Sequence, residues 1–286
     1  MTDARILLSL ESVNMFFGGV HAVRDMNFVI KEHELAGIIG PNGAGKTTVF
    51  NLITGVYNPT NGHTWYRDQD ITPLKAYQIN RLGVARTFQN LRLFGRSSAL
   101  ENVMTAAQNR YRYSFREDLW GNLSPGYSPD PAYHYSFLEA LLHAGRWANA
   151  EKNIRAKSME LLDRVGLADR ADQAAGTLPY GMQRRLEIAR ALALDPKLLL
   201  LDEPAAGMNA EEVLVLNDLI TNIHRDFRLT MLIIEHHMDM IMNICPHIIC
   251  MNFGAKIAEG TPDEIQSNPE VLSAYLGDDY EEEKGA

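Results

Sequence analysis

The chain has little of what would point to a secreted, membrane-spanning or nucleic-acid-binding protein. Its 286 residues include only two cysteines, Cys245 and Cys250, in one apolar region, which predicts small buried thiols in a reduced compartment rather than a disulfide scaffold. No secretory signal is recognisable, and polar residues within 235–239 interrupt the most apolar stretch, so we expect no membrane-spanning helix. Basic residues number 27 against 36 acidic ones, and this net charge of −9 argues against binding to bulk nucleic acid.

What the chain does contain is a complete phosphate-binding pattern, G-x-x-x-x-G-K-[ST], with 46 % hydrophobic residues to build a core around it. The pattern lies between an apolar strand, 36–39, and a helix that begins after Thr47. The backbone N–H groups of the glycine-rich turn can therefore point at phosphate oxygens. Lys46 then reaches the β- and γ-phosphates, and Thr47 offers a hydroxyl to Mg²⁺. A nucleoside triphosphate is therefore the first ligand to consider, held by Gly40, Pro41, Asn42, Gly43, Ala44, Gly45, Lys46, Thr47 and Thr48.

A second set of polar residues follows the apolar segment 197–201, where a doubly wound sheet presents its ligand groups. Asp202 can orient Mg²⁺ or its water, while Glu203 can polarise the water that attacks the γ-phosphate. Pro204 suits the first turn of a following helix. The two carboxylates thus complete a candidate hydrolytic site.

The order of apolar segments predicts an α/β fold in several parts. Residues 7–29, broken at Gly18, read as an antiparallel sheet ahead of the phosphate loop. Strands are expected at 62–66, 84–89, 198–202, 230–234 and 248–251. Between them lies a helical insertion with helices at 101–108, 137–144 and 149–165 and a Gly/Pro-rich loop at 120–131. We expect an α/β core at 1–98 and 193–260, a helical subdomain at 99–192, and a C-terminal helix with an acidic tail at 261–286.

The stretch 178–192, LPYGMQRRLEIARAL, resembles the signature helix of ATP-binding-cassette (ABC) ATPases, and the other family motifs follow in order over about residues 7–276. The resemblance implies that Phe17 stacks on adenine, that Gln89 links Mg²⁺ and the attacking water to the helical subdomain, and that His236 contacts the γ-phosphate. It also implies a dimer-contacting loop at 206–209. The implied catalytic residues are Glu203, His236 and Gln89. The implied Mg²⁺ ligands are Thr47, Gln89 and Asp202. Gly181 is added to the residues that bind the nucleotide.

The signature departs from the family pattern at Pro179, which stands where a serine is usual. Proline supplies neither a hydroxyl nor an N–H, although the helix N-terminus and the Gly181 amide still favour an anion. In this family the signature completes the phosphate site of the partner subunit. Either the partner's site is weakened or Gly181 and the helix dipole suffice, and the sequence leaves both open.

Segments 85–94, 184–190, 202–209 and 260–277 resemble the ATPases of branched-chain amino acid importers, in particular the longer of their two ATPases. The resemblance implies uptake of branched-chain or other hydrophobic amino acids. It also implies three kinds of partner: a second ABC ATPase subunit, two permease subunits and an external binding protein. The permease subunits would dock near Leu91, Leu93 and Phe94. The chain would then be peripheral, on the cytoplasmic face of the cell membrane. Related urea or lipopolysaccharide transporters are the alternative. A soluble cassette protein would favour basic surfaces or paired cassettes, and a small-molecule kinase would lack the signature helix.

A copper or zinc site at His236, His237 and Met238 is the remaining metal hypothesis, because His and Met are metal ligands. In helical geometry neighbouring side chains point about 100° apart, so His237 and Met238 do not share a face. The sequence therefore predicts no metal site besides the Mg²⁺ site.

Overall fold

The computed structural model describes residues 5–108, 112–113, 134–135 and 146–282. The chain divides into two compact units. The first, here called the sheet unit, comprises Met1–Asn90 and Pro196–Ala286, and the second, the helical unit, comprises Leu91–Asp195. The helix expected at 137–144 and the loop expected at 120–131 lie outside the described residues.

The sheet unit contains an antiparallel sheet with the strand order β2-β1-β4-β5. Its strands are β1 (Ile6–Phe17), β2 (Val20–Lys31), β4 (Asn61–Tyr66) and β5 (Gln69–Asp70). Gly18, with φ of 56°, makes the turn between β1 and β2, since a residue without Cβ adopts this left-handed backbone readily. The N-terminal antiparallel sheet expected from the sequence is thus confirmed.

The second sheet of this unit has the order β12-β11-β3-β10-β9-β6 among the described residues, and only β12 runs antiparallel to its neighbour. The three strands at its centre are buried along their whole length, as continuous apolar runs in parallel sheets should be. The strands are β3 (Leu35–Ile39), β6 (Val84–Arg86), β9 (Leu198–Asp202), β10 (Thr230–Ile234), β11 (His247–Asn252) and β12 (Ala255–Gly260).

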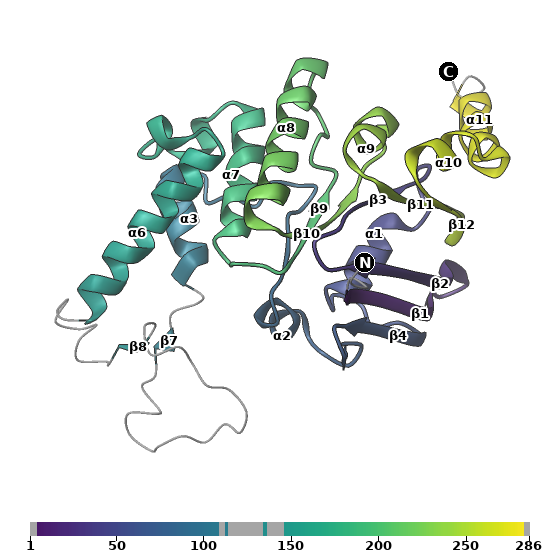
Figure 1. The fold of residues 1–286 in the computed structure, drawn as a ribbon, viewed down its shortest axis with the longest axis horizontal. Helices are drawn as coiled ribbons and strands as arrows, with labels where there is room; N and C mark the ends of the chain where they lie inside the picture. Colours follow the sequence, from purple (N-terminus) through teal and green to yellow (C-terminus); the bar gives the residue numbers. More distant parts are fainter. Residues whose placement is uncertain (1–4, 109–111, 114–133, 136–145, 283–286) are drawn as a thin grey trace. The chain divides into compact units, whose positions relative to one another are not determined.

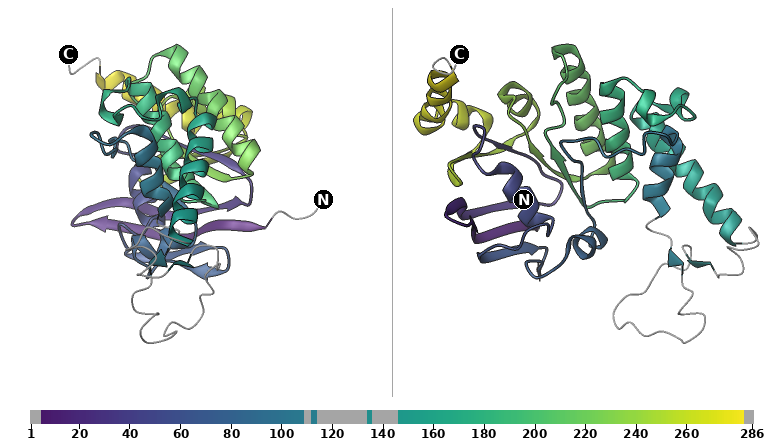
Figure 2. Two further views of the ribbon diagram at one scale, coloured as in Figure 1. Left: turned by 90° about the vertical axis from the view of Figure 1, so that its left-hand side faces the viewer. Right: turned by 180° about the vertical axis from the view of Figure 1, so that it is seen from behind.

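Helix α1 (Lys46–Ile53) lies between the two sheets and joins them through one apolar core (Figure 1 and Figure 2). Phe50 and Ile53 of this helix are fully buried with strand residues such as Leu10, Ile38 and Leu200. This packing holds the helix that follows the phosphate loop in a fixed orientation. The other helices of the unit are α2 (Ala76–Arg81), α8 (Ala210–Phe227), α9 (Met238–Ile244), α10 (Pro262–Gln266) and α11 (Pro269–Glu282).

The start of α8 corrects one expectation. Pro204 does not open a helix: the chain bends at residue 203, residues 204–207 form a turn, and α8 begins at Ala210. The reason is the capping box at Asn209, whose side chain accepts the Glu212 N–H while Glu212 accepts the Asn209 N–H. The capping box supplies hydrogen-bond acceptors for the N–H groups of Asn209 and Glu212, so the helix begins at Ala210, six residues after the proline.

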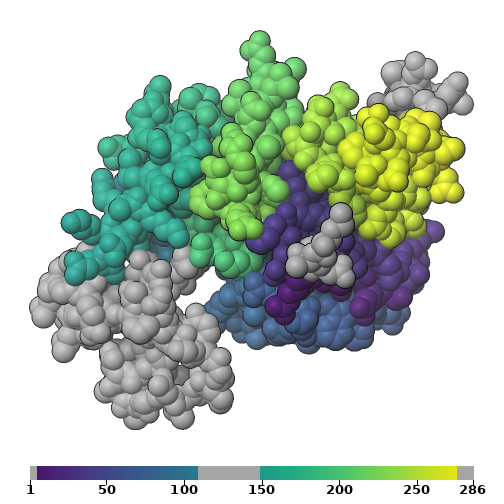
Figure 3. Space-filling view, viewed as in Figure 1, coloured from purple at the N-terminus to yellow at the C-terminus, as the bar shows by residue number. Residues whose placement is uncertain are grey.

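The C-terminal segment belongs to the sheet unit. Figure 3 shows it (yellow) beside the N-terminal strands (purple), in agreement with the packing of β12 on β2. Cys245 and Cys250 are buried free thiols, as expected, and burial raises the pKa of both. In the part of the chain that the structure describes, every helix is too short or too polar to cross a membrane.

The described residues of the helical unit contain three α-helices, α3 (Ala99–Gln108), α6 (Arg146–Arg164) and α7 (Tyr180–Leu192). Helix α3 packs on both α6 and α7, and each helix contributes fully buried residues, among them Val103, Leu162 and Leu186. Short 3₁₀ turns at Ala168–Arg170 and Ala175–Thr177 lead into α7, and β7 (Arg112–Tyr113) pairs with β8 (His134–Tyr135). The helical insertion predicted from the sequence is present.

A charged network ties the ends of three strands together at His247. Its Nδ1 lies 2.7 Å from Glu34 Oε1 and its Nε2 3.0 Å from Glu259 Oε1. The hydrogen bonds to Glu259 and Glu34 raise the pKa of His247 from 6.5 to about 9. The same contact lowers the pKa of Glu259 from 4.5. The network therefore joins an imidazolium to two carboxylates across the ordinary pH range.

This network predicts a loss of stability on the alkaline side. A raised folded-state pKa stabilises the protein fully below pH 6.5, and this contribution disappears as the pH rises through about 9. We expect the free energy of unfolding to fall by roughly 2 to 3 kcal/mol over this interval because of His247. Denaturant unfolding at a series of pH values measures the loss, and His247→Gln should flatten it. A slope unchanged in the variant would contradict the assignment.

Candidate functional site

The phosphate loop connects β3 to α1, and its lysine is held by the loop itself. Lys46 is 5 % exposed, and its Nζ donates to the carbonyl oxygens of Gly40 (2.6 Å) and Pro41 (2.9 Å). The ammonium group is thus fixed at the mouth of the loop, where the terminal phosphates of a nucleotide would meet it. Thr47 and Thr48 follow in the first turn of α1, and both line the adjoining cavity.

Two glycines of the loop are required by their surroundings. A Cβ on Gly40, whose φ is 148°, would lie 2.1 Å from the carbonyl oxygen of Met251 in β11. A Cβ on Gly45, with φ of 98°, would lie 2.5 Å from the carbonyl oxygen of Ala22 in β2. Since both obstacles are backbone atoms, any side chain would push the loop away from the strands that support it.

The parallel register brings the polar residues after three strands to one edge of the sheet. Ile234 of β10 pairs with Ile38 of β3 on one side and with Asp202 of β9 on the other. The phosphate loop, Asp202, Glu203 and the residues after β10 therefore leave the sheet at the same level. This is the edge at which open α/β sheets bind ligands.

Asp202 is buried, 2 % exposed, and forms an ion pair with Arg86 at the end of β6. Arg86 Nη2 donates to Asp202 Oδ2 at 2.5 Å, and its Nη1 donates to Asn51 Oδ1 of α1 at 2.7 Å. The guanidinium also lies against the rings of Phe50 and Phe88. Asp202 Oδ1 has no hydrogen-bond partner among the described residues. One carboxylate oxygen is thus fixed by arginine, and the other remains available to a cation.

The sequence did not mark Arg86 as a partner of Asp202. Its buried ion pair predicts a large loss of stability when the guanidinium is removed. Removing the guanidinium with Arg86→Met should leave the Asp202 charge buried without its partner and lower the free energy of unfolding by roughly 3 to 5 kcal/mol. Denaturant unfolding measures the loss. The control is Arg5→Met, which removes the exposed ion pair of Arg5 with Asp68 and should cost under about 1 kcal/mol. Equal effects of the two substitutions would show that the buried pair contributes no more than a surface pair.

Glu203 has a left-handed backbone, with φ of 46°, which is unusual for a residue other than glycine. Its N–H donates to Ile234 O at 2.9 Å, and this contact holds the turn against β10. The side chain accepts a hydrogen bond from Gln89 Nε2 at 2.7 Å, and its Oε2 lies 4.0 Å from His236 Nδ1. The structure thus brings together Gln89, Glu203 and His236, which the family resemblance had selected.

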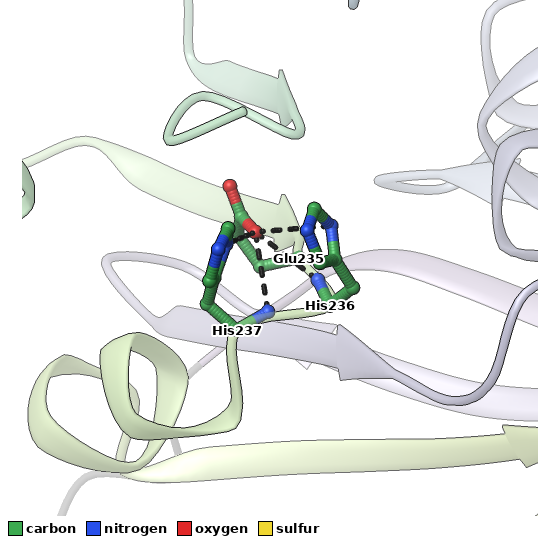
Figure 4. A group of neighbouring side chains, drawn as sticks. All are labelled: Glu235, His236 and His237. Carbon is green, nitrogen blue, oxygen red and sulfur yellow. Dashed lines mark hydrogen bonds and ion pairs between the residues drawn. The ribbon is translucent and has the colours of Figure 1, made fainter. Parts of the chain in front are cut away.

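The residues that follow β10 form a compact cluster of one carboxylate and two imidazoles. Figure 4 shows His236 and His237 on either side of the Glu235 side chain, whose Oε2 lies 3.6 Å from His236 Nδ1 and 3.0 Å from His237 Nδ1. The ring centroids are 4.1 Å apart. Helix α9 begins only at Met238, so the helical geometry invoked to separate His237 from Met238 does not apply to the pair His236 and His237.

A cavity of about 340 Å³ opens over the phosphate loop. Glu203 lines it, and so do residues that the sequence reasoning did not select, from β2 and from the turn between β11 and β12: Val20, His21, Ala22, Arg24, Phe253 and Gly254. Phe253 is 76 % exposed. An exposed phenylalanine beside a phosphate loop is a signal that the sequence alone could not supply, because exposure depends on the fold.

Phe17, the predicted adenine-stacking residue, does not line this cavity. Its ring meets the edge of Tyr57 at a centroid distance of 5.2 Å, and it is 41 % exposed. The neighbouring Phe16 stacks on His21, which does line the cavity, at 3.9 Å. Adenine stacking by Phe17 stays a prediction.

In the helical unit, Pro179 is the N-cap of α7 and makes no side-chain cap hydrogen bond. Its carbonyl accepts the N–H groups of Met182 (2.9 Å) and Gln183 (3.0 Å). Gly181 lies in the first helical turn, where backbone N–H groups favour an anion. Proline is therefore compatible with the start of this helix, although it contributes no cap.

Comparison with known proteins decides the family. The profile of the ABC transporter family matches residues 23–206. The chain belongs to the ABC transporter family. It is an ATPase of that family, as expected, and a nucleotide is its ligand. A second profile, described as a branched-chain amino acid ATP-binding cassette transporter, matches residues 255–281.

Relatives of this ATPase extend over nearly its whole length. The high-affinity branched-chain amino acid transport ATP-binding protein BraF of Pseudomonas aeruginosa is 42 % identical over 96 % of this chain and 99 % of its own. LivG of Escherichia coli, with the same description, is 41 % identical over 95 % and 98 %. A solved ABC transporter cassette in its ADP conformation superposes with a TM-score of 0.76 at 28 % identity, covering 95 % of this chain and 99 % of its own. The predicted fold class is thereby confirmed.

Proposed function

We propose that this ATPase powers the uptake of branched-chain amino acids across a cell membrane. The observation that carries the proposal is similarity over nearly the full length to ATP-binding proteins of such importers, including a family-specific C-terminal segment at 255–281. Urea and lipopolysaccharide transport are the alternatives, and no feature of the described site favours either. The solute itself would be handled by other subunits.

In this proposal Lys46 binds the β- and γ-phosphates and gives up the Gly40 and Pro41 carbonyls as it does so. The cavity beside it is large enough for the phosphates and ribose, with Val20 and Phe253 as apolar walls. Mg²⁺ would be held by Thr47, Gln89 and Asp202, and when bound it neutralises phosphate charge. The buried Asp202 Oδ1, an acceptor with no partner among the described residues, supports this donor set.

Glu203 is the proposed general base for the attacking water. Its carboxylate lines the cavity and is oriented by Gln89 Nε2. The hydrogen bond from Gln89 fixes the orientation of the Glu203 carboxylate. The carboxylate can then accept a proton from a water molecule positioned in line with the γ-phosphate. His236, 4.0 Å from Glu203, would donate a hydrogen bond to the γ-phosphate.

We further propose that the active form pairs two such ATPase subunits, with Gly181 of each at the phosphate of the other. Two permease subunits would dock at the start of the helical unit, where Phe94 is 54 % exposed and Leu91 and Leu93 are half-buried rather than core. An external binding protein would deliver the solute. The chain would lie on the cytoplasmic face of the inner membrane and bind no nucleic acid.

Uptake measurements in the natural host test this proposal. Deleting the coding sequence should abolish high-affinity uptake of radiolabelled leucine, isoleucine and valine, because the permease would lose its energy source. Reintroducing the wild-type chain should restore uptake, and a Lys46→Ala chain should not. Urea uptake in the same deletion strain is the matched comparison. Loss of urea uptake with intact leucine uptake would replace the proposal by its alternative.

A further inference from the structure

The cluster after β10 contains more chemistry than ATP hydrolysis uses. Glu235 and His237 have no part in the proposed mechanism, yet together with His236 they bring three potential metal-binding atoms within 4.8 Å of one another. They come from three consecutive residues that follow a fully buried strand. The arrangement therefore depends on rigid backbone rather than on long flexible side chains.

The two distances from the carboxylate to the imidazoles fit a small tetrahedral cation. With bonds of about 2.0 to 2.1 Å to nitrogen and oxygen, two ligands of tetrahedral Zn²⁺ lie roughly 3.3 Å apart. The distances from Glu235 Oε2 to the histidine Nδ1 atoms, 3.0 and 3.6 Å, lie on either side of this value. Two imidazoles and one carboxylate are also a donor set that zinc sites with an open fourth position use.

The carboxylate is fixed by contacts that a metal would not disturb. Glu235 is fully buried, and its Oε1 accepts the Ala205 N–H at 2.7 Å. Its Oε2 accepts the N–H of His236 at 3.1 Å and faces the imidazoles. Such outer contacts orient a ligand and strengthen a metal site. The imidazoles are about half exposed, at 45 and 43 %, so a cation can reach them from solvent.

We propose that Glu235, His236 and His237 bind Zn²⁺. Mg²⁺, which ATP hydrolysis requires, prefers oxygen ligands and does not compete for this nitrogen-rich site. Zinc on His236 would remove that imidazole from the γ-phosphate, so zinc would inhibit hydrolysis. This consequence, unlike the zinc site itself, rests on the function proposed above for His236.

Zinc binding is tested on the purified full-length chain without nucleotide, by titration against a chromophoric chelator. The wild type should take up zinc with an affinity that His237→Gln lowers at least about tenfold, the smallest loss typical even of outer contacts. Glutamine retains a donor for Glu235, and thermal melting checks that the variant folds. The control is His63→Gln, which alters another exposed histidine–carboxylate pair, 2.9 Å from Asp70, and should leave zinc affinity unchanged. Equal affinity in the wild type and His237→Gln overturns the proposal.

Hydrolysis at buffered free Zn²⁺ and saturating Mg²⁺ and ATP separates the two claims. We expect zinc to inhibit the wild type and the His63→Gln variant, while His237→Gln resists at the same free zinc. If zinc binds the wild type selectively but hydrolysis continues at its full rate, the zinc site stands and the proposed role of His236 fails. Inhibition that is identical in His237→Gln and the wild type would place the inhibitory zinc elsewhere and overturn the claim that zinc inhibits through this cluster.

Discussion

Glu203→Gln is expected to bind ATP normally and to hydrolyse it at least about 10²-fold more slowly, the scale of a lost general base. Glutamine has nearly the same shape as glutamate, so the contact with Gln89 and the turn against β10 can persist. Its amide cannot accept the proton of the attacking water, which is why the effect should fall on kcat. Steady-state phosphate release with equilibrium ATP binding on the same preparation measures both quantities.

The matched control is Glu212→Gln, the same substitution at a partly exposed glutamate of the α8 capping box. It should leave hydrolysis near the wild-type rate, because an amide oxygen still accepts the Asn209 N–H. Hydrolysis by Glu203→Gln at the wild-type rate would remove Glu203 from the role of base. Loss of ATP affinity in that variant would instead indicate that its carboxylate orders the cavity.

Lys46→Ala is expected to abolish ATP binding, because the phosphates would lose the one flexible cation of the loop and retain only amide dipoles. Ligand-induced stabilisation is a sensitive measure. ATP at about 100 times the dissociation constant should stabilise the wild type by roughly 2.7 kcal/mol, and the variant by nothing measurable.

Lys46→Ala also removes the ammonium group that donates hydrogen bonds to the carbonyl oxygens of Gly40 and Pro41. The stability of the nucleotide-free variant must therefore be measured first. Lys31→Ala, at the exposed end of β2, is the control for a lost lysine and should keep the full ATP response. Near-normal ATP stabilisation of a folded Lys46→Ala protein would contradict the assignment of the phosphate loop.

Much of the sheet could be predicted because its pattern is local. The strands at Leu198–Asp202 and Thr230–Ile234 were predicted to the residue, since each is a continuous apolar run bounded by polar residues. The strand expected to reach Gln89 ends instead at Arg86. Beyond Arg86, Thr87 still bonds to β9 through its N–H to Leu200 O and through its hydroxyl, which accepts the Asp202 N–H, and Gln89 donates to Glu203.

What the sequence did not reveal depends on contacts between distant residues. Arg86 and Asp202 are 116 positions apart, and no periodicity marks an arginine that will be buried against phenylalanine rings. The arrangement of His236 and His237 was not predicted, because it depends on the buried Glu235 carboxylate, which accepts the backbone N–H groups of both before helix α9 begins at Met238. A buried acid that organises its own loop has no signature in composition or spacing.

The place of β3 in its sheet has a consequence for the newly made chain. Its hydrogen-bonding partners are β10 on one side and β11 on the other, and both are synthesised after residues 91–195. Until then the phosphate-loop motif emerges from the ribosome on a strand with two open edges, a surface prone to wrong pairing. The backbone of Gly40 also packs closely against the carbonyl group of Met251, one of the last residues of that sheet to be synthesised. A fragment ending before Thr230 would carry the whole motif and lack the strands that shape it.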